Sequence, residues 1–206
     1  MWNLMKRKRS ARNRRARRRV LLLVVVILAV LLLWPSPVEL DSLTSPKAIL
    51  MEADSGEVLA EKKADDPIYP ASMTKMMTAL LTLEANSDLD QPVILPEDIF
   101  PALQAEGASM AGFRPGETAT VRDLLYGALL PSGAECCEAL AREVSGSEEA
   151  FVEQMNQKAA ELGMHSTHFC NPTGLHDPEH VSTVGDMARL TEAALQNETF
   201  RKLFTT

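Results

Sequence analysis

The stretch Tyr69-Pro-Ala-Ser-Met-Thr-Lys-Met-Met-Thr-Ala-Leu80 decides the fold of this chain. Proline is excluded from a helix interior, so we expect an apolar helix to begin just after Pro70 and to end near Asn86. Ser72 and Lys75 then lie one turn apart on the same helix face. A serine hydroxyl beside a lysine amine is a candidate nucleophile beside its base. The alternative is that Ser72 only caps the helix while Lys75 points into water.

The N-terminal 34 residues have the layout of a secretory signal or a signal-anchor. Residues 1–19 hold ten of the 21 Lys and Arg residues and no acid, and residues 20–34 form the unbroken apolar run VLLLVVVILAVLLLW. A basic flank before an apolar run is typical of export signals, so we interpret residues 1–19 as a cytoplasmic tail and not as a nucleic-acid-binding segment. Everything after residue 34 is then exported.

Retention and cleavage of this segment remain two alternatives. Fifteen apolar residues are fewer than the about 20 of an ordinary spanning helix, which favours a cleaved signal peptide. No small-x-small cleavage site follows, and Trp34 is placed like an interfacial anchor. We expect a retained signal-anchor, with a secreted form as the alternative. Residues 35–46 are rich in Pro and Ser and predict a linker, which leaves residues 47–206 as the folded domain.

The folded part predicts one early hairpin followed by helices. Two short apolar runs within residues 47–61 flank Asp54-Ser55-Gly56, a hairpin signal, and residues 92–95 are a further strand candidate. Caps and apolar periodicity predict further helices, at 121–129, 134–144, 148–162 and 183–196. Residues 62–70, 96–119 and 164–182 are expected to be irregular. The fold class is therefore α/β of the α+β type, with an incomplete antiparallel sheet, because two or three strands do not form a stable sheet.

The three cysteines, Cys136, Cys137 and Cys170, do not form a disulfide framework. Their number is odd, and neighbouring cysteines in a helix cannot easily bridge each other. We expect buried free thiols, with one bridge from Cys170 to the pair as the alternative.

A second serine lies in the break between two expected helices, in Leu130-Pro-Ser-Gly133. Ser132 could simply cap the helix that follows. Together with Ser72 and Lys75, however, it matches a known set of motifs. Serine acyl-transferases of the penicillin-binding class combine Ser-x-x-Lys, a Ser-x-Asn-type loop and a Lys-Thr-Gly strand.

From about residue 45 onward the chain resembles the low-molecular-mass penicillin-binding proteins, the serine-type D-alanyl-D-alanine carboxypeptidases. The segments that carry the resemblance occur in the family's order, at 70–78, 116–127, 130–133, 155–156, 162–164, 167–169 and 171–175. The resemblance implies a β-lactamase/transpeptidase-like fold with a helical subdomain, of which this chain is the N-terminal part. It also implies a bacterial cell membrane location with the catalytic part outside the cytoplasm.

The same resemblance implies a role for each site residue. Ser72 would be the nucleophile that attacks the penultimate D-Ala carbonyl of a peptidoglycan stem peptide, and Lys75 its general base. The backbone N–H of Ser72 would form half of an oxyanion hole, and Ser132 would relay a proton to the leaving D-Ala. Water then hydrolyses the acyl-enzyme, and β-lactams would acylate the same serine. No metal and no cofactor is implied.

Two departures from the family pattern stand out. Ala134 occupies the position of the expected Asn, whose amide would hold the substrate and the lysine, and no Lys-Thr-Gly occurs in the 206 residues. The neighbouring Glu135, when ionised, would repel a carboxylate substrate. The substrate-binding residues are therefore unassigned, and we expect this chain alone to be catalytically incompetent or nearly so.

Three other functions compete with the carboxypeptidase. A non-catalytic, membrane-tethered remnant that binds wall peptides or a partner is favoured by Ala134 and opposed by the intact Ser72/Lys75 pair. A class A-like serine β-lactamase shares Ser-x-x-Lys, but the Asn171-Pro-Thr-Gly segment resembles the carboxypeptidases instead. A zinc carboxypeptidase would use the four histidines, which lie in a loop-rich stretch without a His-Glu-x-x-His motif.

Overall fold

The computed structural model describes residues 39–206. The predictions of a basic tail and a signal-anchor, and the first four residues of the predicted linker, fall on residues 1–38 and lie outside the described residues. Among the residues described, no helix combines the length and the apolar character needed to cross a membrane.

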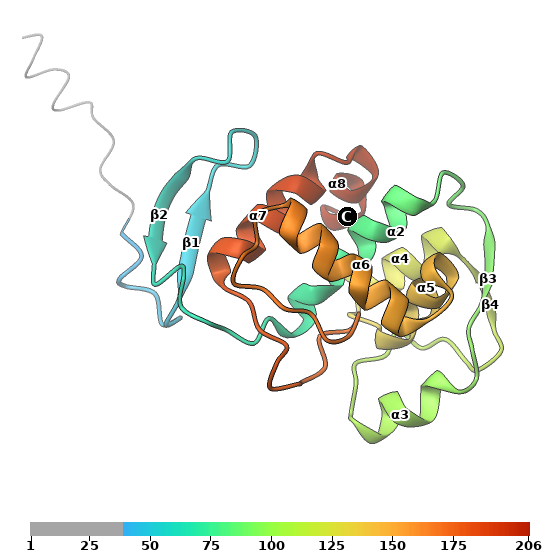
Figure 1. Cartoon of the computed structure of the whole chain (residues 1–206). Helices are drawn as coiled ribbons and strands as arrows, with labels where there is room; N and C mark the ends of the chain where they lie inside the picture. The colour runs from blue at the N-terminus through green and yellow to red at the C-terminus, as the bar shows by residue number, and fades with distance from the viewer. Residues whose placement is uncertain (1–38) are drawn as a thin grey trace, which may run out of the picture. The chain divides into compact units, whose positions relative to one another are not determined.

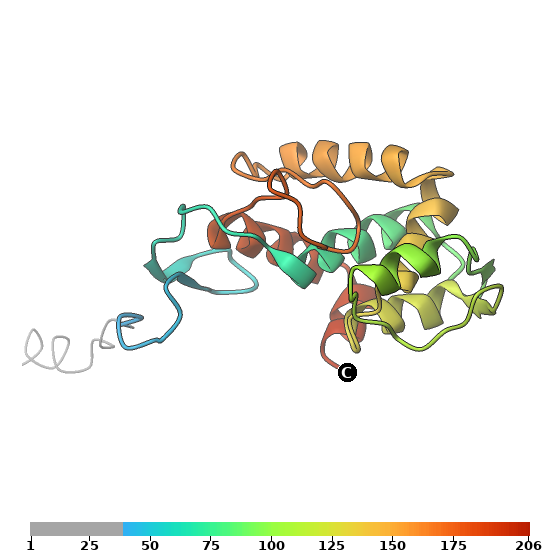
Figure 2. The same ribbon diagram turned by 90° about the horizontal axis from the view of Figure 1, so that it is seen from below.

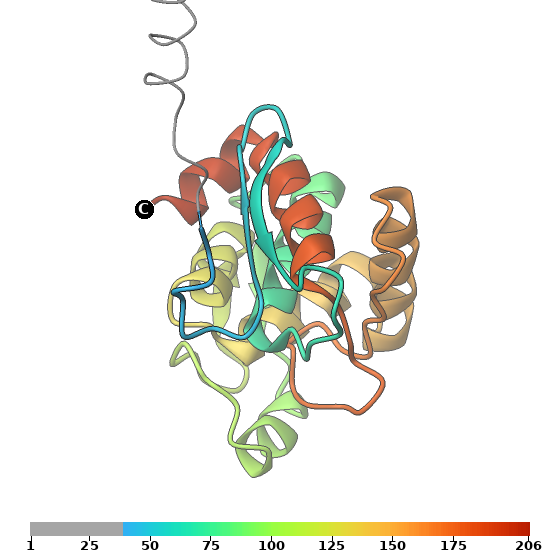
Figure 3. The same ribbon diagram turned by 90° about the vertical axis from the view of Figure 1, so that its left-hand side faces the viewer.

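The predicted hairpin is present. Strands β1 (Ala48–Met51) and β2 (Val58–Lys62) pair antiparallel, with a register irregularity between Leu50 and Met51. Gly56 in the connecting turn has a positive φ of 69°, which glycine adopts without strain. β1 contacts helix α7 (Val184–Leu195), so the hairpin lies beside that helix in two perpendicular views (Figure 1 and Figure 3).

The central element is the helix that follows Pro70. It begins with a 3-10 turn, η1 (Ala71–Thr74), and continues as α2 (Lys75–Ala85), which confirms the predicted helix with a tighter first turn. The first nine residues of α2 are all buried. A helix that is buried on all sides needs neighbours on all sides, and α2 contacts α4, α5, α6, α7 and α8.

The helices predicted from caps and periodicity are confirmed within about two residues. They are α4 (Val121–Leu129), α5 (Ala134–Ser145), α6 (Glu148–Glu161) and α7. Thr120 and Asp123 form a reciprocal capping box at α4, and the Thr183 side chain accepts from the Asp186 N–H at α7. These local hydrogen bonds satisfy backbone donors at the helix starts, which is why the sequence signals are reliable.

Three elements were not predicted. Residues 96–119, expected to be irregular, contain α3 (Ile99–Ala105) and β4 (Thr118–Thr120), and α8 (Glu198–Phe204) follows α7. β4 pairs antiparallel with β3 (Pro92–Ile94), so the described strands form two separate two-stranded ribbons. α3 carries Pro101 in its first turn, a tolerated position that nevertheless resembles a loop signal.

The core gathers around α2. Its largest fully buried side chains are Phe151, Phe169, Phe200, Met77, Leu95, Leu124, Leu125, Leu140, Met155, Met164, Leu190 and Leu203. Figure 2 shows α6 along the outer side and the segment between α6 and α7 folded next to η1. That segment, residues 162–183, brings backbone groups from late in the chain to the start of α2.

Candidate active site

The three side chains singled out in the sequence lie together. Lys75 Nζ donates to Ser72 Oγ at 3.1 Å, and Ser132 Oγ donates to the same oxygen at 2.9 Å. Ser72 comes from η1, Lys75 from the first residue of α2, and Ser132 from the turn between α4 and α5. Ser72 is exposed whereas Lys75 is only 5% exposed. An accessible hydroxyl next to a buried amine is the arrangement that an activated serine requires.

Two of the residues in this site have backbone conformations that L-residues rarely adopt. Ala71, directly before Ser72, has φ 48°, and Ser132 has φ 65°. Such conformations cost about 1–3 kcal/mol each and persist only where surrounding contacts enforce them. Around Ser132 these contacts are backbone hydrogen bonds: the Gly133 N–H donates to the Gly127 carbonyl, and the Ala134 N–H donates to the Ser109 carbonyl, both at 2.8 Å.

Lys75 has a second partner that the sequence did not reveal. Its Nζ donates to the Thr173 carbonyl oxygen at 2.7 Å. Burial lowers the pKa of Lys75, and the negative charge of Glu135 acts in the opposite direction. A lysine with a lowered pKa is neutral in a larger fraction of molecules near neutral pH, and a neutral amine can accept the serine proton.

The segment Asn171-Pro-Thr-Gly, in a stretch expected to be irregular, holds Lys75 in place. Asn171 Oδ1 accepts from the backbone N–H groups of Thr173 and Gly174 and from Thr173 Oγ1. The Pro172 carbonyl accepts from Thr78 Oγ1 at 2.7 Å, one turn further along α2. Two successive carbonyls of this turn therefore accept hydrogen bonds from two successive turns of α2.

Ala134 leaves Lys75 without the expected amide partner, whereas Glu135 takes a position that the sequence did not predict. Ala134 is 1% exposed and offers no polar group to Lys75. Glu135, which we expected to stand against a carboxylate substrate, is instead fully buried. Its Oε1 accepts from three successive N–H groups, of Ala111, Gly112 and Phe113, at 2.7, 2.9 and 3.3 Å, while Oε2 has no partner within the part of the chain that is described. Glu135 thus fixes the 111–113 segment beside the Ser132 turn.

The histidines take structural positions. His180 is 2% exposed, its Nε2 lies 2.8 Å from Thr74 Oγ1, and its Nδ1 accepts from the Cys170 N–H. Burial lowers the pKa of His180 to about 4, so the ring is neutral at neutral pH and contacts Thr74, the residue directly before Lys75. His176 packs edge-on against Tyr69. Within residues 39–206, no three His, Cys, Asp or Glu side chains lie close enough to hold a metal ion.

Comparison with known proteins identifies the family. The sequence model for D-alanyl-D-alanine carboxypeptidases matches residues 35–206. The chain belongs to this family. It is 43% identical over 159 residues to the D-alanyl-D-alanine carboxypeptidase DacF of Bacillus subtilis, an alignment that covers 75% of this chain and 40% of DacF. It is 38% identical over 168 residues to DacC of Escherichia coli, covering 78% of this chain and 42% of DacC.

The solved structures of the family share the fold. The crystal structure of a Streptomyces DD-transpeptidase is 32% identical, with a TM-score of 0.77 over 82% of this chain and 67% of that one. Penicillin binding protein 6B from Escherichia coli is 28% identical, with a TM-score of 0.77 over 84% of this chain and 56% of that one. The DD-peptidase fold expected from the resemblance is therefore confirmed. The chain spans about two fifths of the length of the two curated carboxypeptidases.

The cysteines of this chain are free thiols with raised pKa values. The three cysteines are free, as expected, and Cys136 and Cys137 are buried, although Cys170 is partly exposed. Burial raises the pKa of Cys137 to about 12 and that of Cys170 to about 11, and it also raises the pKa of Cys136. Because the thiolate is the reactive form, none of them competes with Ser72 as a nucleophile.

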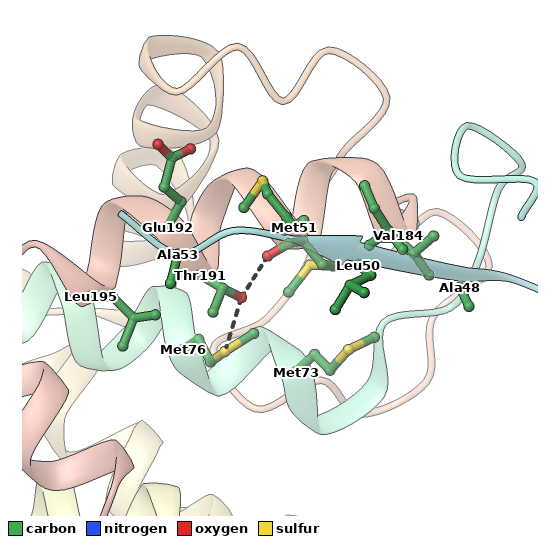
Figure 4. A pocket seen from close by; sticks show the side chains of 13 residues that line it. Ala48, Leu50, Met51, Ala53, Met73, Met76, Val184, Thr191, Glu192 and Leu195 are labelled. Carbon is green, nitrogen blue, oxygen red and sulfur yellow. Dashed lines mark hydrogen bonds between the residues drawn. The ribbon is translucent and has the colours of Figure 1, made fainter. Parts of the chain in front are cut away.

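A largely apolar pocket of about 450 Å³ lies between β1, the η1–α2 helix and α7 (Figure 4). Met73 and Met76 line it from one side, and Thr191 of α7 lies opposite, with its hydroxyl 3.7 Å from Met76 Sδ. Ser72 and Lys75 do not line this pocket. The hydroxyl-amine pair therefore projects from a different side of the same helix.

Proposed function

We propose that this chain carries the nucleophile of a serine-type D-alanyl-D-alanine carboxypeptidase that trims peptidoglycan stem peptides through an acyl-enzyme on Ser72. The observation that supports it most directly is the contact of a buried lysine amine with an exposed serine hydroxyl, at 3.1 Å, in a member of this family.

The geometry suggests how each group would act. When Lys75 is neutral, Ser72 Oγ donates its proton to Nζ as the oxygen attacks the carbonyl carbon of the penultimate D-Ala. The backbone N–H of Ser72 would stabilise the oxyanion. Ser132 Oγ, 2.9 Å from Ser72 Oγ, would pass a proton to the leaving D-Ala nitrogen as the peptide bond breaks. A water molecule then hydrolyses the ester and restores Ser72.

The same proposal includes the location and the inhibitors. Residues 20–34 would act as a signal-anchor, residues 35–46 as the linker, and residues 47–206 as the extracytoplasmic catalytic part at a bacterial cell membrane. β-Lactams would acylate Ser72, because they resemble the terminal dipeptide. The family match supports a carboxypeptidase over the class A β-lactamase alternative.

The test is acylation by a fluorescent penicillin, followed by intact mass measurement and mapping of the modified residue. We expect a slow, incomplete adduct on Ser72, because the chain has no Lys-Thr-Gly. Ser72→Ala should abolish the adduct, whereas the matched control Ser87→Ala, at an exposed loop serine, should retain it. Rapid stoichiometric labelling would contradict the expected weakness but support the nucleophile. Binding of a stem-peptide analogue with no adduct at any pH would favour the non-catalytic alternative.

A further inference from the structure

A second, polar pocket adjoins the candidate active site. It has a volume of about 340 Å³ and lies between α3, α5, the start of α6 and the segment 170–177. Thr173 connects the two sites, because its carbonyl accepts from Lys75 while the residue also lines this pocket. A ligand here would lie next to the turn that holds the lysine.

The walls of this pocket are acidic. Its carboxyl groups are those of Asp98, Glu106, Glu138, Glu148 and Asp177. Arg142 is the arginine in the wall, and it is already paired with Asp98 at 2.8 Å. The side chain of His176 is engaged with Tyr69. The pocket therefore has an excess of negative charge that favours a cation.

Glu138 gives a second reason, separate from the acidic lining, to expect a bound cation in this pocket. The residue is only 7% exposed, and its carboxyl group has no hydrogen bond or ion pair among the residues described. Burying such a group without a partner is costly, and buried polar side chains normally have one. Burial, with Glu148 nearby, raises the pKa of Glu138 to about 8. A bound cation would allow this carboxyl group to ionise.

The spacing of the acids argues for an organic cation. Within residues 39–206, no three His, Cys, Asp or Glu side chains are grouped closely enough for a metal ion. An ammonium group, in contrast, has three N–H donors that reach separate acceptors. Ile99, Leu103 and Leu175 also line the pocket and offer apolar surface to an alkyl stem.

We propose that this pocket binds a primary alkylammonium group, with Glu138 as the carboxylate that pairs with it. Two sources share this chemistry. One is a free diamine, and the other is an amino side chain of the stem peptide itself, which rests on the proposed function. In the second case the pocket determines substrate specificity beside the nucleophile.

Calorimetric titration of the full chain separates these sources. The probes are 1,5-diaminopentane, Nα-acetyl-Lys-D-Ala-D-Ala and its Nε-acetylated form. We expect the diamine to bind, and Glu138→Gln to weaken binding by at least about tenfold, as for the loss of a charged partner. Glu143→Gln, at an exposed carboxylate on the same helix, should leave the affinity unchanged. Near neutral pH, binding should also release a proton, which appears as buffer-dependent heat and is absent in Glu138→Gln.

A second variant and the two peptides provide further tests of the proposal. If Glu138→Gln fails to fold, Glu148→Gln, which changes a half-buried wall of the same pocket, should still weaken diamine binding. Weaker binding of the Nε-acetylated peptide would identify the stem peptide as the source, and equal binding of both peptides would identify a free amine. No diamine binding, equal binding by Glu138→Gln, or binding of Ca²⁺ in place of the amine would overturn the proposal. Diamine binding does not depend on Ser72 acylation, so the two proposals can fail separately.

Discussion

Gly174 lies directly against the backbone of Ala71. A Cβ at residue 174 would overlap the Ala71 carbonyl and would stand 3.1 Å from the Ser72 nitrogen, and Gly174 has φ 80°. The turn at residues 171–174 and η1 therefore meet backbone to backbone. This contact helps explain how Ala71 is held at a positive φ.

Gly174→Ala should disrupt the site. An alanine at a positive φ lowers the unfolding free energy by roughly 1 kcal/mol. Because the new Cβ would also overlap the Ala71 carbonyl, we expect Gly174→Ala to lower it by more than that. Gly107→Ala is the matched control, because Gly107 has φ 65° but nothing within 4 Å of its Cβ position. Thermal unfolding and penicillin labelling of both variants measure the difference. Equal stability of the two variants would show that the contact with Ala71 is unimportant.

The acylation rate should increase with pH in a way set by Lys75. Burial lowers the pKa of this lysine below its usual 10.5, so its neutral, basic form is reached at lower pH than for a free lysine. The rate should therefore rise and reach a plateau before the ordinary lysine value. Lys75→Arg keeps the positive charge but cannot provide a neutral base, so it should lower the acylation rate by about 10²–10⁴-fold. Rates measured across neutral and alkaline pH decide this, and a midpoint at or above 10.5 would contradict it.

His180 should make the domain sensitive to acid. Its pKa is lowered from 6.5 to about 4, so the unfolded chain binds a proton more readily than the folded one. The stabilisation is complete above about pH 6.5 and is lost as the pH falls towards about 4. In urea unfolding over this pH interval, the unfolding free energy of His180→Gln should depend less steeply on pH than that of the wild type. The exposed His165→Gln should keep the wild-type slope.

Glu135 should stabilise the Ser132 turn through its acceptor oxygen. Glu135→Ala leaves three N–H groups without their acceptor, and we expect a loss of about 3 kcal/mol or more in unfolding free energy. Glu135→Gln keeps an acceptor oxygen and should lose less. Urea denaturation measures the order of the three proteins. An alanine variant as stable as wild type would mean that these hydrogen bonds add nothing net.

Local signals account for what the sequence predicted. The Ser72/Lys75 pair follows from helix spacing after a proline, and the starts of α4 and α7 follow from side chains that cap their own backbone. Tertiary contacts account for the rest. The Thr173 carbonyl has no side-chain signature, and the burial of Glu135 depends on a segment about 23 residues away. α3 forms despite Pro101 because Ile99, Phe100 and Leu103 are buried.

The late position of Thr173 also affects the timing of assembly. Thr173, the backbone partner of Lys75, lies 98 residues further along the chain. Because a polypeptide is synthesised from its N-terminus, Ser72 emerges well before the turn that fixes its neighbouring amine. A nascent chain that stops short of residue 173 thus has the serine and the lysine but not this anchor. The hydrogen bond between Lys75 Nζ and the Thr173 carbonyl can therefore form only after residue 173 has been synthesised.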